Sequence, residues 1–116
     1  HTPNIALIEY AKQARETYKT ALLSNIGEVM MDELFDGKVQ EYFNEVILSY
    51  KEGLAKPNPE IFTLTAERLG LRPEECVLID DIAANCESAN IVGMRSILHI
   101  SNELTFEKLA VLLKEQ

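Results

Sequence analysis

The sequence lacks the features that direct a chain to a membrane or to nucleic acid. It contains no run of about 18 apolar residues, so no transmembrane helix is predicted. No basic segment followed by an apolar run opens the chain, so no signal peptide is expected. Positive charge is scarce, because 11 lysines and arginines against 19 aspartates and glutamates give a net charge of −8. A chain this acidic offers no basic face, so neither nucleic acid nor an anionic membrane is expected as a partner.

Cysteine is scarce too. Cys76 and Cys86 form no Cys-x-x-Cys pair, and we interpret them as reduced thiols of a cytoplasmic protein. His99 has no cysteine or histidine partner at metal-ligand spacing, so it gives little indication of a metal site. The loops Gly-x-Ser-x-Gly, Gly-x-Gly-x-x-Gly and the P-loop are absent, so the enzyme classes that depend on them are not indicated.

What is present is a regular alternation of apolar runs and helical patterns. The 116 residues are 47% hydrophobic and 26% charged, which suits one globular domain over residues 1–116. Strands are predicted at 19–24, 45–50, 76–79 and 94–98, and helices at 28–35, 82–92 and 105–115. Two further helices are predicted to open at Thr2-Pro3 and at Asn58-Pro59, the second ending at Gly70. Continuously apolar strands between helices predict an α/β fold, a parallel sheet with helices on both faces.

Polar residues stand at or just after three of these strands. Ser24 and Asn25 follow the first strand, Lys56 lies in the loop after the second, and Asp80 and Asp81 end the third. In open parallel sheets, ligands bind beyond the carboxyl ends of the strands. We therefore expect these five residues to converge on one crevice.

The Asp80–Asp81 pair is the strongest of these signals. Two adjacent carboxylates after a buried strand repel each other unless a cation or hydrogen-bond donors compensate. Mg²⁺ prefers such hard oxygen ligands, and typically takes one or two carboxylates together with phosphate and water. The alternative is that the aspartates cap the next helix, although one of them would suffice for that role.

The other polar residues are ambiguous when taken singly. Lys56 is either a solvated loop lysine or a compact charge that neutralises carboxylates and a phosphate. Ser24 and Asn25 either cap the next helix or donate hydrogen bonds to a phosphate oxygen. Asn85, four residues after Asp81, either bonds a carboxylate in the site or faces solvent.

Three motifs together resemble the haloacid-dehalogenase-like (HAD) family of hydrolases. Residues 22–25 (LLSN) resemble the family's second motif, an apolar strand ending in Ser or Thr. Residues 55–62 (AKPNPEIF) look like the third motif, and residues 77–85 (VLIDDIAAN) resemble the fourth. Their order, spacing and strand context agree, and the resemblance covers essentially the whole chain.

The resemblance implies a Rossmann-like fold and a role for each site residue. Ser24 would hold a phosphate oxygen, with Asn25 beside it in the substrate site. Lys56 would stabilise the nucleophile and the transferring phosphoryl group. Asp81 would bind Mg²⁺ directly, Asp80 would act through a water or from the second shell, and Asn85 would support them. The implied reaction is hydrolysis of a small phosphorylated metabolite through an aspartyl-phosphate.

The sequence departs from the family pattern at the first motif. No Asp-x-Asp occurs, so the motif that supplies the nucleophile, the acid/base and a Mg²⁺ ligand is missing, and so is the cap. The family sheet has strand order 5-4-1-2-3, so this chain would supply strands 2 to 5 and leave either a central gap or a re-paired sheet. The chain begins at His1 rather than Met. We expect the missing N-terminal segment to come from the same gene product or from another chain, and the isolated chain to be inactive.

Other functions remain open from the sequence. A non-catalytic HAD-like interaction module would need no charged crevice, yet Ser24, Lys56 and the two aspartates are all kept. A haloacid dehalogenase or a phosphomutase is a second alternative, although dehalogenation needs no metal and the acid pair favours Mg²⁺. A phosphoacceptor receiver domain is a third, but there the acid pair follows the first strand and the lysine comes late.

Overall fold

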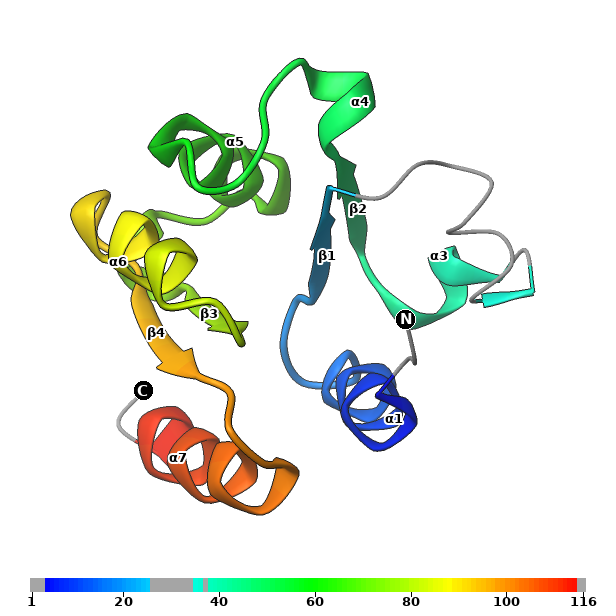
Figure 1. The fold of residues 1–116 in the computed structure, drawn as a ribbon. Helices are drawn as coiled ribbons and strands as arrows, with labels where there is room; N and C mark the ends of the chain where they lie inside the picture. The colour runs from blue at the N-terminus through cyan, green and yellow to red at the C-terminus, as the bar shows by residue number, and fades with distance from the viewer. Residues whose placement is uncertain (1–3, 26–34, 37, 115–116) are drawn as a thin grey trace.

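The computed structural model describes residues 4–25, 35–36 and 38–114. In these residues helices and strands alternate along the chain, as expected (Figure 1). The four strands are β1 (Ala21–Ser24), β2 (Glu45–Leu48), β3 (Val77–Asp80) and β4 (Arg95–Leu98). The helices are α1 (Ile5–Ala14), α3 (Val39–Tyr42), α4 (Ser49–Glu52), α5 (Pro59–Leu69), α6 (Ala83–Ile91) and α7 (Asn102–Lys114), with a 3-10 turn at Pro73–Glu75.

The strands form two separate parallel pairs. β1 pairs with β2 in the register Leu22↔Val46, and β3 pairs with β4 in the register Leu78↔Ser96. In Figure 1 the pairs lie on either side of a gap, with β1 and β3 on its two sides. This order agrees with the one that the family resemblance implies when the central strand is left out.

Alternate residues of β1 and β2 face two different helical layers. Leu23 and Ile47 pack in a core with Phe62 of α5. Their neighbours Leu22 and Val46 belong to a second cluster that includes Ile8 of α1. Because side chains alternate along a strand, this division places helices on both faces of the sheet, as the α/β prediction required.

The boundaries of α5 follow the sequence prediction, since they depend on local signals. The Asn58 side chain accepts the backbone N–H of Glu60 at 3.0 Å and caps the helix, and Pro59 occupies its first position. Gly70 ends it with a left-handed φ of 72°, and its N–H bonds back to the last turn. Gly at this position avoids the steric cost that a side chain brings to left-handed backbone.

Other predicted boundaries were wrong. β2 ends at Leu48 because Ser49 and Tyr50 begin the short helix α4, which Gly53 ends with a φ of 69°. The last helix begins at Asn102 rather than at 105, after a turn in which the Ser101 hydroxyl accepts the N–H of Leu104.

Two helix predictions fall partly outside the described residues. The first described helix begins at Ile5, and its cap is Asn4, which accepts the N–H of Leu7. The predicted opening at Thr2-Pro3 is outside the described part of the chain. So is most of the helix predicted at 28–35, of which only buried Phe35 is described.

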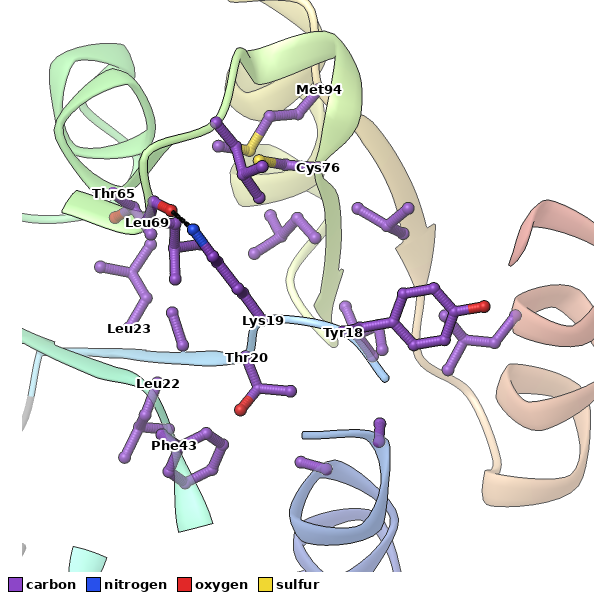
Figure 2. A pocket seen from close by; sticks show the side chains of 18 of the residues that line it. Tyr18, Lys19, Thr20, Leu22, Leu23, Phe43, Thr65, Leu69, Cys76 and Met94 are labelled. Atoms are coloured by element: carbon purple, nitrogen blue, oxygen red, sulfur yellow. Dashed lines mark hydrogen bonds between the residues drawn. The ribbon is translucent and has the colours of Figure 1, made fainter. Parts of the chain in front are cut away.

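A cavity of about 550 Å³ separates β1 from β3. No backbone pairing joins these two strands in the part of the chain that the structure describes. All four residues of β1 are only half-buried, whereas a central strand of a two-sided parallel sheet is normally buried. The lining is mostly apolar, and Figure 2 shows Leu22, Leu23, Leu69, Cys76 and Met94 around it.

Side chains make further contacts around this cavity. Tyr10 of α1 stacks on Phe106 of α7, with ring centroids 4.7 Å apart. At the amino end of β1, the Lys19 ammonium donates to the carbonyl of Leu69 at 2.8 Å (Figure 2). This bond places a positive charge at the C-terminus of α5, where the helix dipole favours one.

Both cysteines are buried and form no disulfide, and burial raises the pKa of each thiol. A raised pKa keeps the thiols protonated and unreactive, consistent with a packing role. No helix in the described residues is long and apolar enough to cross a membrane.

A matched pair of isoleucines tests the placement of the core. Ile61 of α5 is 0% exposed, and Ile91 of α6 is 75% exposed. We expect Ile61→Ala to lower the free energy of unfolding by about 2–5 kcal/mol through the lost contacts and the cavity left behind. Ile91→Ala should change it by less than about 0.5 kcal/mol. Urea denaturation of both variants measures this, and equal losses would contradict the assignment of the core.

Candidate active site

An ion pair between Lys56 and Asp80 lies at the carboxyl end of β3. The Lys56 Nζ and Asp80 Oδ2 atoms are 2.8 Å apart. The side chains are 16% and 5% exposed, respectively. Removing one partner of an ion pair this shielded from water costs more stability than removing one partner of a surface pair, because the other charge is left buried and uncompensated.

The Asp80 carboxylate accepts two further hydrogen bonds. Asn85 Nδ2 donates to Oδ2 at 3.1 Å, and the backbone N–H of Ile82 donates to Oδ1 at 2.9 Å. Asn85 is 4% exposed, so it faces the site rather than solvent. Burial by itself raises the pKa of Asp80, but the bond from Lys56, the other two donors and the lysine charge outweigh it. The pKa of Asp80 therefore lies below its ordinary value, and the group is a carboxylate at neutral pH.

Asp81 differs from its neighbour. It is exposed, and within the described residues no hydrogen bond or ion pair engages its carboxylate. No described group of three or more His, Cys, Asp or Glu residues is placed to hold a metal ion. Asp81 therefore offers one hard oxygen donor group, with the engaged Asp80 beside it. This set fits Mg²⁺, which uses one or two protein carboxylates and completes its shell with phosphate and water.

The capping alternative for the acid pair holds only in part. Asp80 does accept the N–H of Ile82, yet Ile82 itself is the N-cap of α6 and no side chain caps that helix. One carboxylate oxygen of Asp80 thus supports the start of α6, while the other faces Lys56 and Asn85. Asp81 has no capping bond in the described structure.

Ser24 and Asn25 lie at the carboxyl end of β1, across the gap from β3. Ser24 is the last residue of the strand and is half-buried. Asn25 contacts Lys56, and the helix predicted to follow it lies mostly outside the described residues. Its Oδ1 accepts the backbone N–H of Lys56 at 3.2 Å, and its Nδ2 lies 3.4 Å from the Lys56 carbonyl oxygen. The structure thus brings Asn25, Lys56, Asp80 and Asn85 into one connected polar group.

His99 was assigned no functional role from the sequence. Its backbone N–H donates to the carbonyl of Asp80 at 2.8 Å, so it lies at the same edge of the sheet. Its ring nitrogens lie 2.7 Å from Thr105 Oγ1 and 3.3 Å from Asn4 Nδ2. The sequence signal was its position directly after the fourth strand, and not any metal-ligand spacing.

The profile of haloacid dehalogenase-like hydrolases matches residues 4–93 of the sequence. The chain belongs to this family. The match contains α1 through α6 and, with them, Ser24, Asn25, Lys56, Asp80, Asp81 and Asn85, while His99 lies beyond it.

Known HAD-like proteins resemble the chain in sequence and in fold. A glyceraldehyde 3-phosphate phosphatase from Methanopyrus kandleri is 35% identical over 66% of this chain and 34% of its own length. A D-ribitol-5-phosphate phosphatase from Bacteroides thetaiotaomicron is 30% identical over 86% of this chain and 46% of its own length. The crystal structure of a HAD family enzyme from the same organism, in complex with magnesium and inorganic phosphate, superposes with a TM-score of 0.75. It is 32% identical, over 86% of this chain and 54% of that one.

The chain therefore spans less than half the length of these two curated relatives, and about half of the solved enzyme. Within that span it carries the HAD-like fold and the polar group at the carboxyl edge of the sheet.

The lowered pKa of Asp80 predicts a loss of stability in acid. A carboxyl whose pKa is lower in the folded than in the unfolded state stabilises the fold above its unfolded pKa of about 3.9, and less as the pH falls toward the folded value. We expect the urea midpoint of unfolding to fall from about pH 4.5 downward. Because Lys56 lowers this pKa, Lys56→Met should make the decline shallower.

The matched control is Lys108→Met, which removes an exposed lysine of α7. This variant should keep the pH dependence of the parent protein. If Lys56→Met and Lys108→Met show the same decline as the parent, the ion pair does not set the pKa of Asp80.

Proposed function

We propose that this chain is the C-terminal portion of the core domain of a Mg²⁺-dependent HAD-like phosphatase that acts on a small phosphorylated metabolite. The observation that carries the proposal is the shielded Lys56–Asp80 pair with exposed Asp81 next to it, all at the carboxyl edge beside the gap. The two related phosphatases and the related enzyme bound to magnesium and phosphate support the same chemistry. Its expected location is the cytoplasm.

Each residue has a role in this proposal. Asp81 holds Mg²⁺ through its carboxylate. Asp80 supports the site indirectly by orienting Lys56. The Lys56 ammonium stabilises the negative charge of the nucleophile and of the transferring phosphoryl group. The Ser24 hydroxyl and the backbone beside it hold a phosphate oxygen, and Asn85 fixes the carboxylate of Asp80. When bound, Mg²⁺ neutralises charge on the phosphate and orients it.

The nucleophile comes from a strand that fills the gap between β1 and β3. Both strands present a parallel edge to the cavity, and within the described residues no strand pairs with either edge. A strand inserted there would form ladders with both. An apolar strand ending in Asp-x-Asp would place its first carboxylate near Lys56. That oxygen attacks phosphorus, the ester P–O bond breaks, and the leaving oxygen takes a proton from the second carboxyl of the motif. Water then attacks the aspartyl-phosphate and gives a proton to that carboxylate, which releases phosphate and restores both groups.

An interaction module without chemistry is the weaker alternative. Burying Lys56 and Asp80 costs desolvation energy of both ions, and a binding module gains nothing from that cost at the edge of the sheet.

The dependence on a further strand predicts complementation. The 116-residue chain alone should not hydrolyse p-nitrophenyl phosphate in the presence of Mg²⁺. Adding the gene-encoded segment that carries Asp-x-Asp, in the same chain or as a separate peptide, should produce turnover that EDTA abolishes and Mg²⁺ restores. Turnover by the 116 residues alone that Asp81→Asn removes would show that the nucleophile lies within them, and would refute this proposal.

The role of Lys56 is tested in the complemented enzyme. Lys56→Met should lower kcat for p-nitrophenyl phosphate by at least about a hundredfold, since it removes a charge aimed at the developing negative charge. Lys51→Met, at an exposed lysine in α4, should leave kcat within about twofold. Equal activity of the two variants would exclude Lys56 from the reaction.

A further inference from the structure

The side-chain amide of Asn25 forms hydrogen bonds to both polar groups of the Lys56 main chain. Asn25 Oδ1 accepts the Lys56 N–H at 3.2 Å, and Asn25 Nδ2 donates to the Lys56 carbonyl at 3.4 Å. A primary amide carries a donor and an acceptor side by side, so it can pair with one residue of backbone much as a neighbouring strand does. A serine, threonine or aspartate at position 25 offers no such matched pair at neutral pH.

The loop around Lys56 is also held from its other side. The backbone N–H of Asn58 donates to the carbonyl of Ala55 at 2.9 Å, which closes a turn around Lys56 and Pro57. The Asn58 side chain then accepts the N–H of Glu60 and fixes the turn to the start of α5. The backbone of Lys56 is therefore supported by the end of β1 on one side and by α5 on the other.

Asn25, Lys56 and Asp80 form a continuous bridge between the two half-sheets. Asn25 follows β1, and Asp80 ends β3, two strands that share no backbone pairing in the described residues. Lys56 connects them, with its main chain on Asn25 and its ammonium 2.8 Å from Asp80. The position of the ammonium over the carboxyl edge thus depends on Asn25 at one end and on the carboxylate at the other.

We propose that Asn25 is a positioning residue for Lys56, and acts through the main chain of the lysine rather than by binding substrate. The proposal rests on the role of Lys56 given above. Both polar atoms of the Asn25 side chain are turned toward the loop, which leaves contact with the phosphate to Ser24 and to backbone donors. Asn85 has the complementary position, because it holds the carboxylate partner of the same ion pair.

Lysine labelling tests this without requiring activity. The full-length protein is treated with a limiting amount of acetic anhydride, and acetylation of Lys56 is measured by mass spectrometry relative to exposed Lys51. Asn25→Ala should raise the relative labelling of Lys56 about fivefold, the effect of losing hydrogen bonds that restrain it. Asn25→Gln keeps both ends of the amide and should recover part of the protection.

The matched control is Asn44→Ala. Asn44 is also exposed and also accepts a backbone N–H, that of Thr20 at 2.8 Å, but at the amino end of β1 and β2. It should leave the labelling of Lys56 unchanged. If Asn25→Ala labels Lys56 no faster than Asn44→Ala does, the proposal is overturned.

Kinetics in the complete enzyme separate positioning from substrate binding. A positioning role predicts that Asn25→Ala lowers kcat for p-nitrophenyl phosphate about tenfold while KM stays within about twofold. A rise in KM with unchanged kcat would show direct substrate contact and would overturn the proposal. If the wild-type protein hydrolyses no phosphate ester, the proposed function fails, and the labelling result still decides whether Asn25 positions Lys56.

Discussion

The ion pair between Lys56 and Asp80 joins two halves of a sheet that share no backbone hydrogen bond in the described structure. Parallel strands are normally held together by their ladders, and here the two inner strands lack one. Side-chain contacts through Asn25, Lys56 and Asp80 connect the carboxyl ends of these two strands. At its amino end, β1 is held to its covering helix α5 by the bond from Lys19 to Leu69.

This arrangement explains why the polar and apolar parts of the structure adjoin. The cavity is mostly apolar because it lies between two layers of helices, and its carboxyl end is polar because strand ends and loops meet there. Unpaired strand edges beside an apolar cavity are unfavourable for a chain in isolation, since they expose backbone groups and apolar surface together. Insertion of one strand would pair with the two strand edges and cover the apolar surface. The last residue of that strand would lie beside the carboxyl ends of β1 and β3, where the site residues are.

Local signals made much of the fold predictable from sequence, and long-range contacts made the rest unpredictable. The Asn58 cap, Pro59 and Gly70 define both ends of α5 by local signals, so that helix was predicted correctly. The end of β2 was missed because the prediction extended the strand across Ser49 to Tyr50, whereas Gly53 and its hydrogen bond to Ser49 turn the chain into α4. For the site, the strand ends indicated that Asn25, Lys56 and Asp80 would meet, and these three are in contact. The sequence could not indicate that Asn25 would turn to the backbone of a residue 31 positions away, or that His99 would bond to Thr105 and Asn4.

The central claim is that the gap between β1 and β3 accepts one strand that pairs with both. Amide hydrogen exchange on the 116-residue chain, with and without the Asp-x-Asp segment, tests this claim most directly. In a strand, alternate N–H groups point to opposite neighbours, so about half of the amides of β1 and β3 face the gap. The account predicts that these amides exchange fast in the chain alone and become strongly protected when the segment is present, while the others in the β1–β2 and β3–β4 ladders change little. Amides that are already protected in the chain alone, or that stay unprotected in an active complemented enzyme, would contradict it.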